Sequence, residues 1–194
     1  MSGWIVALVG PLGAGKDTVA KHLVEKRGFR RFAFADAIKR EYYAASGHSE
    51  DEFKASRGTP LETEIREGLW HHSDQVKRER GSLYFINLVV GAMLDCPSPA
   101  VVTDIRTREE LDAMRQAGAK VVLVLRTDAD PHMLGNTVGF RDNTPIPGAR
   151  LSYKDLRWDD KLFLNRECAD PASLDCVIGR FCEESGIVVD QDND

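Results

Sequence analysis

The amino-acid sequence predicts an α/β fold with three layers, α/β/α, around a five-stranded parallel sheet, in a single domain that spans residues 1–194. Three observations predict this fold. A short apolar run near the start of the chain leads into a glycine-rich bend. Further apolar runs of strand length alternate with stretches of helical periodicity. The runs are apolar almost throughout, as in strands that are buried on both faces of a parallel sheet.

The composition limits the class of protein. The chain is 42% hydrophobic and 29% charged, which excludes a disordered or fibrous protein. The net charge of -5 argues against a nucleic-acid or membrane-surface partner. No apolar run is long enough to cross a bilayer, and the first strand leaves no room for a signal peptide. We therefore expect a cytoplasmic protein, in the host cytoplasm if a virus encodes it.

Cysteine spacing gives no sign of a disulfide framework or a zinc site. The chain has four cysteines and no Cys-x-x-Cys pair. We expect them to be reduced, buried thiols: Cys96, Cys168, Cys176 and Cys182.

The first predicted strand, residues 4–9, is expected at the centre of the sheet because it is apolar throughout. From Lys16 onward, apolar residues recur at helical spacing. Gly28 is suited to a left-handed cap and ends this helix.

A second strand is predicted over residues 31–35, with Asp36 as the N-cap of the helix that follows. Because ligands bind at strand ends in doubly wound sheets, Asp36 and Lys39 on one helix face are also site candidates. A polar stretch over 47–58 precedes a helix with apolar residues every fourth position. Arg66 or Arg57 could reach a substrate phosphate from there, and a solvated charged face is an equal alternative for each.

The second half of the chain continues the alternation. Thr107 and Glu110 have the spacing of a capping box and begin a helix that Gly118 ends. The irregular, proline- and glycine-containing stretch over 127–150 is predicted to be a lid that carries Arg141. The remaining predicted elements are a buried helix over 83–94, strands over 100–104, 120–125 and 160–165, and a helix over 172–185.

The glycine-rich bend has the spacing of a phosphate-binding loop. In such a loop, backbone N–H groups and the next helix's N-terminus surround phosphate oxygens, and the lysine reaches the β- and γ-phosphates. A Ser or Thr that holds Mg²⁺ normally follows the lysine, but here Asp17 does, and Thr18 comes one residue later. The residues predicted to bind ATP are Gly10, Gly13, Ala14, Gly15, Lys16, Asp17 and Thr18.

The strand ends supply the other groups that phosphoryl transfer requires. In one doubly wound sheet, Asp36, Asp104 and Arg106 are expected at the same edge as the loop. Phosphoryl transfer needs cations around the transferring group and a metal between phosphate oxygens. Residues of these types are Lys16, Asp17, Thr18, Asp104, Arg106 and Arg141.

These landmarks resemble those of the bacteriophage deoxynucleoside-monophosphate kinases and, more loosely, of the animal phosphomevalonate kinases. The sequence departs from the family pattern at Thr107-Arg108, where a Phe-Pro pair is usual. The matching landmarks, in chain order, are residues 15–18, residues 34–39, residues 103–106 followed by Glu109, and Asp160 with Asn165.

The resemblance implies a P-loop kinase that moves the γ-phosphoryl group of ATP to a (deoxy)nucleoside monophosphate with Mg²⁺. The predicted partners are small-molecule nucleotides, with no nucleic acid and no membrane, and a homodimer is left open. The predicted catalytic residues are Lys16, Asp17, Asp36, Arg106 and Arg141; the acceptor-binding residues are Asp36, Lys39, Arg66 and Arg106; the metal-binding residues are Asp17, Thr18 and Asp104.

Two alternative functions stay open at this point. One keeps the fold and changes the acceptor to another small phosphorylated metabolite, as in phosphomevalonate or dephospho-coenzyme A kinases. The other is a nucleotide-binding regulatory protein without turnover, which Asp17 in place of the metal-binding hydroxyl would favour.

Overall fold

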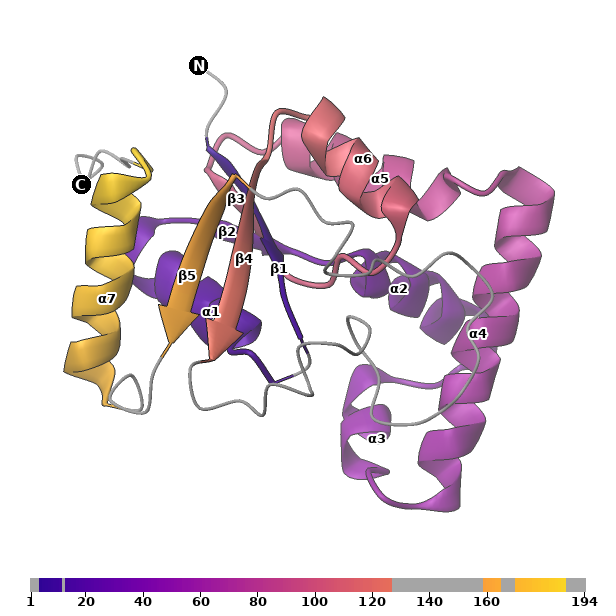
Figure 1. The fold of residues 1–194 in the computed structure, drawn as a ribbon. Helices are drawn as coiled ribbons and strands as arrows, with labels where there is room; N and C mark the ends of the chain where they lie inside the picture. The colour runs from indigo at the N-terminus through magenta and orange to yellow at the C-terminus, as the bar shows by residue number, and fades with distance from the viewer. Residues whose placement is uncertain (1–3, 12, 127–158, 165–169, 188–194) are drawn as a thin grey trace. The chain divides into compact units, whose positions relative to one another are not determined.

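The structure, a computed structural model, describes residues 4–11, 13–126, 159–164 and 170–187. Figure 1 shows the helices and strands with the labels used from here on. The strands are β1 (Ile5–Val9), β2 (Arg30–Phe32), β3 (Ala100–Val102), β4 (Lys120–Arg126) and β5 (Asp160–Leu164). The helices are α1 (Lys16–Arg27), α2 (Phe34–Ser46), α3 (Glu50–Ala55), α4 (Pro60–Arg80), α5 (Tyr84–Leu94), α6 (Arg108–Gln116) and α7 (Pro171–Glu184).

The sheet is parallel, with the strand order β2-β3-β1-β4-β5 (Figure 1). β1 is central, as predicted, and all five of its residues are buried. Ile5 lies opposite Ala100 of β3, and Val6 lies opposite Lys120 of β4. Because these strands are parallel, the segments that follow β1 and β3 leave the sheet at the same edge.

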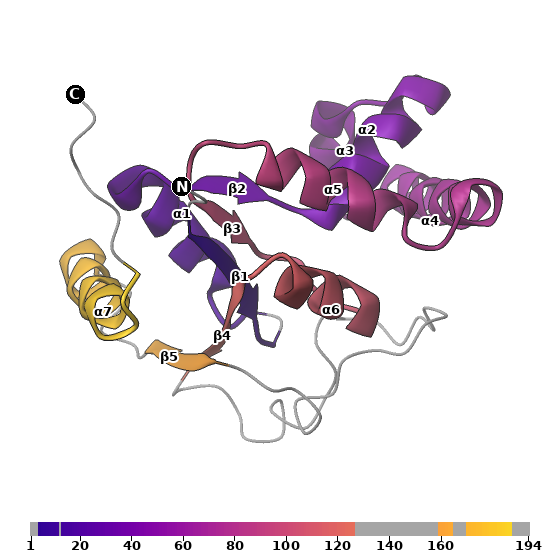
Figure 2. The same ribbon diagram turned by 90° about the horizontal axis from the view of Figure 1, so that it is seen from above.

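Helices cover both faces of the sheet. Viewed from above, α1 and α7 lie on one face of β1 and β4, and α6 lies on the other (Figure 2). The side of α6 that is buried carries Leu111 and Met114, which have no exposed surface. The three-layer α/β/α arrangement and the five strands are therefore as predicted.

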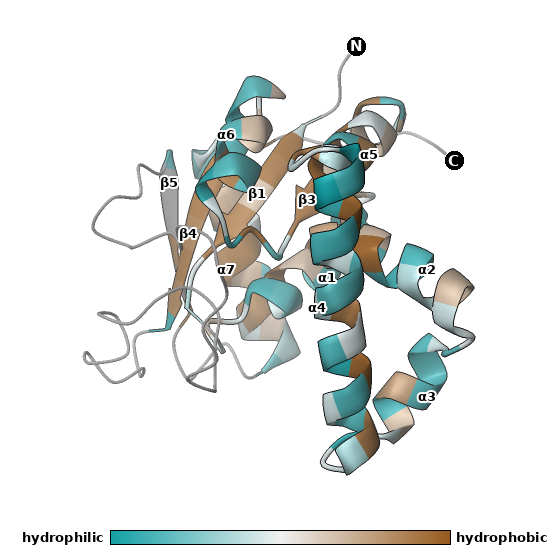
Figure 3. Cartoon of the chain, turned by 90° about the vertical axis from the view of Figure 1, so that its right-hand side faces the viewer, coloured by the Kyte–Doolittle hydropathy of each residue, from teal (hydrophilic) through white to brown (hydrophobic). Residues whose placement is uncertain are grey.

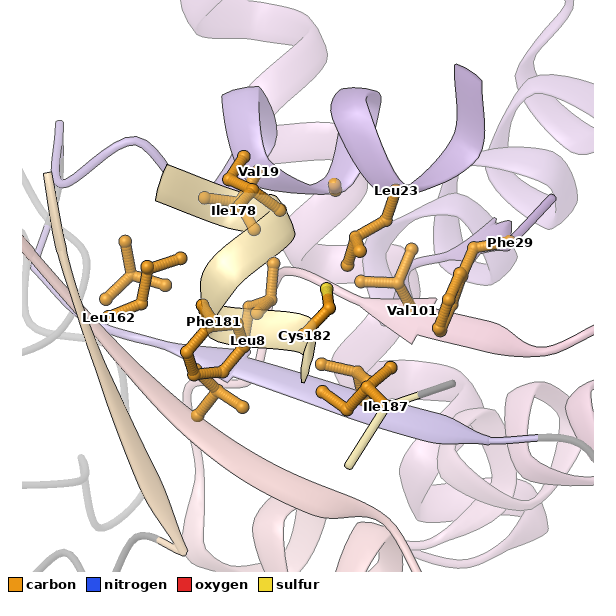
Figure 4. Packing of buried hydrophobic residues seen from close by; sticks show 14 of the residues in the cluster. Leu8, Val19, Leu23, Phe29, Val101, Leu162, Ile178, Phe181, Cys182 and Ile187 are labelled. Carbon is orange, nitrogen blue, oxygen red and sulfur yellow. The ribbon is translucent and has the colours of Figure 1, made fainter. Parts of the chain in front are cut away.

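The main apolar cluster fixes α1 against the sheet. Val19 and Leu23 of α1 meet Leu8 of β1, and Ile178 and Phe181 of α7 pack on the same cluster (Figure 4). Burial of side chains of this size stabilises a fold by about 1.5–3 kcal/mol each. The start of α1, where the glycine-rich bend ends, is thereby held in place by the core.

The chain divides into two compact units, of which the second is the continuous segment Ala33–Ala92. This unit has a small apolar cluster of its own around Tyr42, Phe53 and Ile65. Gly68 of α4 lies against the Tyr42 side chain, where a Cβ atom would collide with the phenol oxygen. In Figure 3, α4 has both hydrophilic and hydrophobic positions along its length, as expected of a helix with one buried side.

The predicted second strand is wrong at its C-terminal end. β2 ends at Phe32, and Phe34 already belongs to α2, whose N-cap is Ala33. Asp36 is therefore in the first turn of α2 and is not its N-cap. Alternating Phe and Ala suit a strand, but Ala33, Phe34 and Ala37 are buried at a spacing that also suits a helix.

Burial also differs from expectation at several positions. The predicted buried helix α5 exposes Leu88 by 44% and Leu94 by 56%. Cys176 is exposed, Cys96 is half-buried and Cys182 is buried, and all three are free thiols.

Some predictions fall on residues that the structure does not describe. These are the lid over 127–150 with Arg141, and also Asn165 and Cys168. Within the described part of the chain, every helix is too short or too polar to cross a membrane.

Candidate functional site

The loop after β1 depends on glycine at three positions. Gly10, Gly13 and Gly15 have φ angles of 153°, 77° and 95°, which side chains other than glycine's disfavour. A Cβ atom on Gly10 would collide with the Val124 carbonyl oxygen, and one on Gly15 would lie 2.5 Å from Leu164 Cδ1. Close packing against backbone thus requires Gly10, whereas backbone conformation favours glycine at Gly13 and Gly15, and at Gly15 the Leu164 side chain would also have to move.

The N-terminus of α1 opens directly into this loop. Its N-cap is Gly15, which has no side chain that could cap the helix. The first N–H groups of any helix have no partner within the helix, and together with the helix dipole they favour an anion. This end of α1 is therefore suited to phosphate oxygens.

Lys16 reaches back across the loop. Its Nζ donates hydrogen bonds to the carbonyl oxygens of Gly10 and Pro11, both at 2.8 Å. Burial lowers the pKa of Lys16; the carboxylate of Asp17 acts in the opposite direction, and the charge of Arg106 lowers the pKa further. The ammonium is thus held at the loop, within electrostatic range of Arg106.

The segment between β3 and α6 brings Arg106 to the same edge of the sheet as the loop. β3 is the direct neighbour of β1, and Asp104 and Arg106 follow its last residue, Val102, by two and four positions. Asp104 is half-buried and Arg106 is exposed. Two of the predicted charged groups, Lys16 and Arg106, therefore lie at one edge of the sheet within electrostatic range of each other, and their roles stay predictions.

Glu110 holds this segment from the first turn of α6. Its Oε2 accepts hydrogen bonds from the backbone N–H groups of Arg106 and Thr107, at 2.6 Å and 2.9 Å. Thr107 in turn accepts from the Glu110 N–H, which completes the predicted capping box. Burial raises the pKa of Glu110, while the two N–H groups lower it and the charge of Asp104 raises it.

A cavity of about 730 Å³ lies beside the loop, between α1 and α7. Gly15 and Thr18 of the loop line it, together with Arg126 at the end of β4 and apolar groups such as Leu164 and Pro171. His22 lies at this cavity, with Nε2 3.3 Å from Asp175 Oδ1. Sequence reasoning missed this cavity because its walls come from distant parts of the chain.

The predicted metal ligands have the chemistry that Mg²⁺ takes. Asp17 and Thr18 are exposed at the start of α1, and Asp104 is half-buried after β3. Among the described residues there is no cluster of three or more acidic, histidine or cysteine side chains that could hold a metal ion. Mg²⁺ at phosphate sites takes one or two protein ligands along with water and phosphate oxygens, so these residues fit it.

Three predicted acceptor residues lie in the second unit, with Asp36 in the first turn of α2. Lys39 Nζ lies 3.1 Å from Glu50 Oε1, and Tyr43 donates to Glu50 Oε2 at 3.2 Å. Arg66 is on α4, with a hydrogen bond of 2.7 Å to Glu62.

Two of these cations also contact an aromatic ring of the second unit. The Lys39 ammonium lies 5.6 Å and the Arg66 guanidinium 5.2 Å from the centre of the Phe53 ring. Each cation thus contacts the Phe53 ring in addition to its carboxylate partner, Glu50 or Glu62. The roles of Asp36, Lys39 and Arg66 stay predictions, as does that of Arg141 outside the described residues.

Known protein families and curated proteins give no match to this chain. Among solved structures, TT1252 from Thermus thermophilus is similar, with 14% identity over 93% of this chain and 98% of that one, at a TM-score of 0.51. Shikimate kinase from Bacteroides thetaiotaomicron has 14% identity over 93% and 97% of the two chains, at a TM-score of 0.42. APS kinase from Mycobacterium tuberculosis has 16% identity over 92% and 98%, at 0.39. The chain therefore shares an α/β fold with TT1252.

Proposed function

We propose that this chain is an ATP-dependent phosphotransferase that acts on a small phosphorylated metabolite, and that the metabolite is a (deoxy)nucleoside monophosphate. The observation that carries the proposal is the loop from Gly10 to Thr18. In it, the Lys16 ammonium donates to the carbonyl oxygens of Gly10 and Pro11, beside the N-terminus of α1. A glycine loop, a helix N-terminus and a lysine in this arrangement bind the phosphates of a nucleotide.

The cavity beside the loop supports a nucleoside triphosphate as the donor. It continues from Gly15 and Thr18, so a ligand with its phosphates in the loop would extend into it. Its volume of about 730 Å³ falls in the range of small-molecule sites. We assign the nucleoside half of ATP to this cavity.

Charge neutralisation is the chemical role of the groups around the loop. On phosphate binding, the Lys16 ammonium would exchange the carbonyl oxygens of Gly10 and Pro11 for phosphate oxygens. Arg106 would supply a second cation to the transferring group. Asp17, Thr18 and Asp104 would hold Mg²⁺ or its waters, and the ion would neutralise charge on the β- and γ-phosphates.

The choice of acceptor rests on the family resemblance and on cations of the second unit. Lys39 and Arg66 are suited to a phosphate group, but each is paired with a carboxylate in the structure. An acceptor phosphate at Lys39 would therefore have to displace Glu50. Asp36 would orient the acceptor from the first turn of α2.

A coupled assay of ADP release tests the activity. The purified protein is given ATP, Mg²⁺ and each common nucleoside or deoxynucleoside monophosphate in turn, and then phosphomevalonate and dephospho-coenzyme A. We expect turnover with a nucleoside monophosphate. Turnover with another acceptor alone would overturn the acceptor assignment, and ATP binding without any transfer would favour the regulatory alternative.

A matched pair of lysine variants tests the role of the loop. Lys16→Ala is expected to lower kcat by about 100-fold or more, because it removes a cation from the transferring group. Lys54→Ala, which removes an exposed lysine of α3, is expected to leave kcat unchanged. Circular dichroism of both variants shows whether they are folded. A Lys16→Ala variant that keeps full turnover would refute the proposed site.

A further inference from the structure

Glu110 makes one hydrogen bond that its helix cap does not require. In a capping box, the third residue of the helix accepts from the N–H of the N-cap residue, which here is Thr107. The same Oε2 atom of Glu110 also accepts from the N–H of Arg106, at 2.6 Å, the shorter of the two distances. The carboxylate therefore ties down the residue that precedes the cap.

Arg106 is the residue on this segment whose position matters for the loop. Its side chain is exposed, and its charge acts on the Lys16 ammonium. The backbone of Arg106 lies between β3 and α6, outside the regular hydrogen bonds of either element. The half-buried carboxylate of Glu110 holds its N–H at 2.6 Å.

We infer that Glu110 is a positioning residue: by holding the Arg106 N–H, it fixes where the guanidinium of Arg106 stands relative to Lys16 and the phosphate loop. This inference rests on the proposed function, because it gives Glu110 a role in phosphoryl transfer beyond helix capping. A supporting group of this kind matters because small misplacements of a reacting arrangement are costly to the rate.

Four variants separate positioning from capping. Glu110→Ala removes both N–H contacts, and Glu110→Asp has a side chain one methylene shorter, which withdraws the carboxylate from Arg106. Glu110→Gln keeps an oxygen that can accept both bonds. Thr107→Ala is the matched control, because it removes the other half of the capping box and leaves the acceptor for Arg106 in place.

The first readout is independent of activity. Hydrogen exchange followed by NMR is expected to show faster exchange of the Arg106 amide in Glu110→Ala and Glu110→Asp. Exchange at Arg106 is expected to stay slow in Glu110→Gln and in Thr107→Ala. Equal exchange of Arg106 in all variants and in the parent protein would overturn the inference.

The second readout is the kinetics with ATP and the acceptor that the parent protein uses. Glu110→Ala and Glu110→Asp are expected to lower kcat by about 10- to 100-fold, with a smaller change in KM, since Arg106 acts on charge in the transition state. Glu110→Gln and Thr107→Ala are expected to stay within about threefold of the parent kcat. If Glu110→Gln is as slow as Glu110→Ala, or if Thr107→Ala is as slow, the positioning role is refuted.

The two proposals fail in different ways. A parent protein that shows no turnover with any acceptor overturns the proposed function, whatever the variants do. A parent protein that turns over while Glu110→Ala and Thr107→Ala have the same kcat overturns the positioning role alone. If Glu110→Ala does not fold, Glu110→Asp provides the same comparison.

Discussion

Replacing Gly10 with alanine would place a methyl group against the sheet where the phosphate loop begins. Gly10 has a φ angle of 153°, and a Cβ atom there would collide with the carbonyl oxygen of Val124 and lie 3.3 Å from its carbonyl carbon. Val124 belongs to β4, which pairs directly with β1. Because both strands are buried, neither can move aside without breaking ladder hydrogen bonds.

Gly13 provides the matched control for this substitution. Its φ angle of 77° is also unfavourable for alanine, but nothing lies within 4 Å of the Cβ position. Gly13→Ala is therefore expected to lower the free energy of unfolding by about 1–2 kcal/mol, the cost of a left-handed backbone. Gly10→Ala is expected to lose about 1–3 kcal/mol more than that, the cost of overpacking.

Urea unfolding followed by circular dichroism measures both free energies. Since a domain of this size is stable by about 5–15 kcal/mol, the difference between the variants is well within the range of the measurement. A Gly10→Ala variant that is too unstable to fold agrees with the reasoning. Equal stability of the two variants would refute the argument from close packing.

Three further predictions concern single groups. Burial raises the pKa of Tyr43 to about 12, and the negative charge of the Glu50 carboxylate adds to this shift. The folded protein thus holds this proton more tightly than the unfolded chain, so the stabilisation is complete below about pH 10 and is lost as the pH rises towards about 12. Tyr43→Phe should remove that part of the alkaline loss in urea unfolding. Burial lowers the pKa of His22, although the charge of Asp175 opposes the shift. The neutral His22 ring therefore contributes to the stability of the folded state above about pH 6.5, and this contribution is lost as the pH falls. An NMR titration of the His22 ring should give a pKa below that of an exposed histidine. A thiol reagent with mass spectrometry should label Cys176 well before Cys182, because Cys182 is buried and burial raises its pKa.

Each of these has an outcome that contradicts it. The same alkaline stability profile for Tyr43→Phe and the parent would exclude a raised Tyr43 pKa. A His22 pKa at or above the usual value would mean that Asp175, rather than burial, dominates its environment. Labelling of Cys182 as fast as Cys176 would show that the α7 face against the sheet opens readily.

Sequence periodicity was sufficient to predict the layers of this fold. The apolar run of β1 and the helical spacing after Lys16 depend on local chemistry that the chain itself carries. The capping box at Thr107 and Glu110 could also be predicted, since its two residues are three apart and cap the same helix end.

What the sequence could not predict depends on local backbone direction or on groups that are far apart in the chain. The bond from Arg106 to Glu110 needs a backbone direction that residue spacing does not specify. The exposure of Leu88 and Cys176 depends on which side of each helix meets the rest of the fold. The cavity beside Thr18 needs Arg126 and Pro171, which come together only when the sheet has formed.

The register of β1 has a consequence for how this protein is made. Ile5 pairs with Ala100, and Val6 with Lys120, so β1 leaves the ribosome well before either of its partner strands. The helical segment Ala33–Ala92 is complete before then and has a local apolar cluster. Because local contacts form faster than distant ones, we expect this segment to gain structure during translation while β1 is still unpaired. An unpaired apolar strand is a site for chaperone binding, and the phosphate loop after β1 would not take its final form until β3 and β4 have been synthesised.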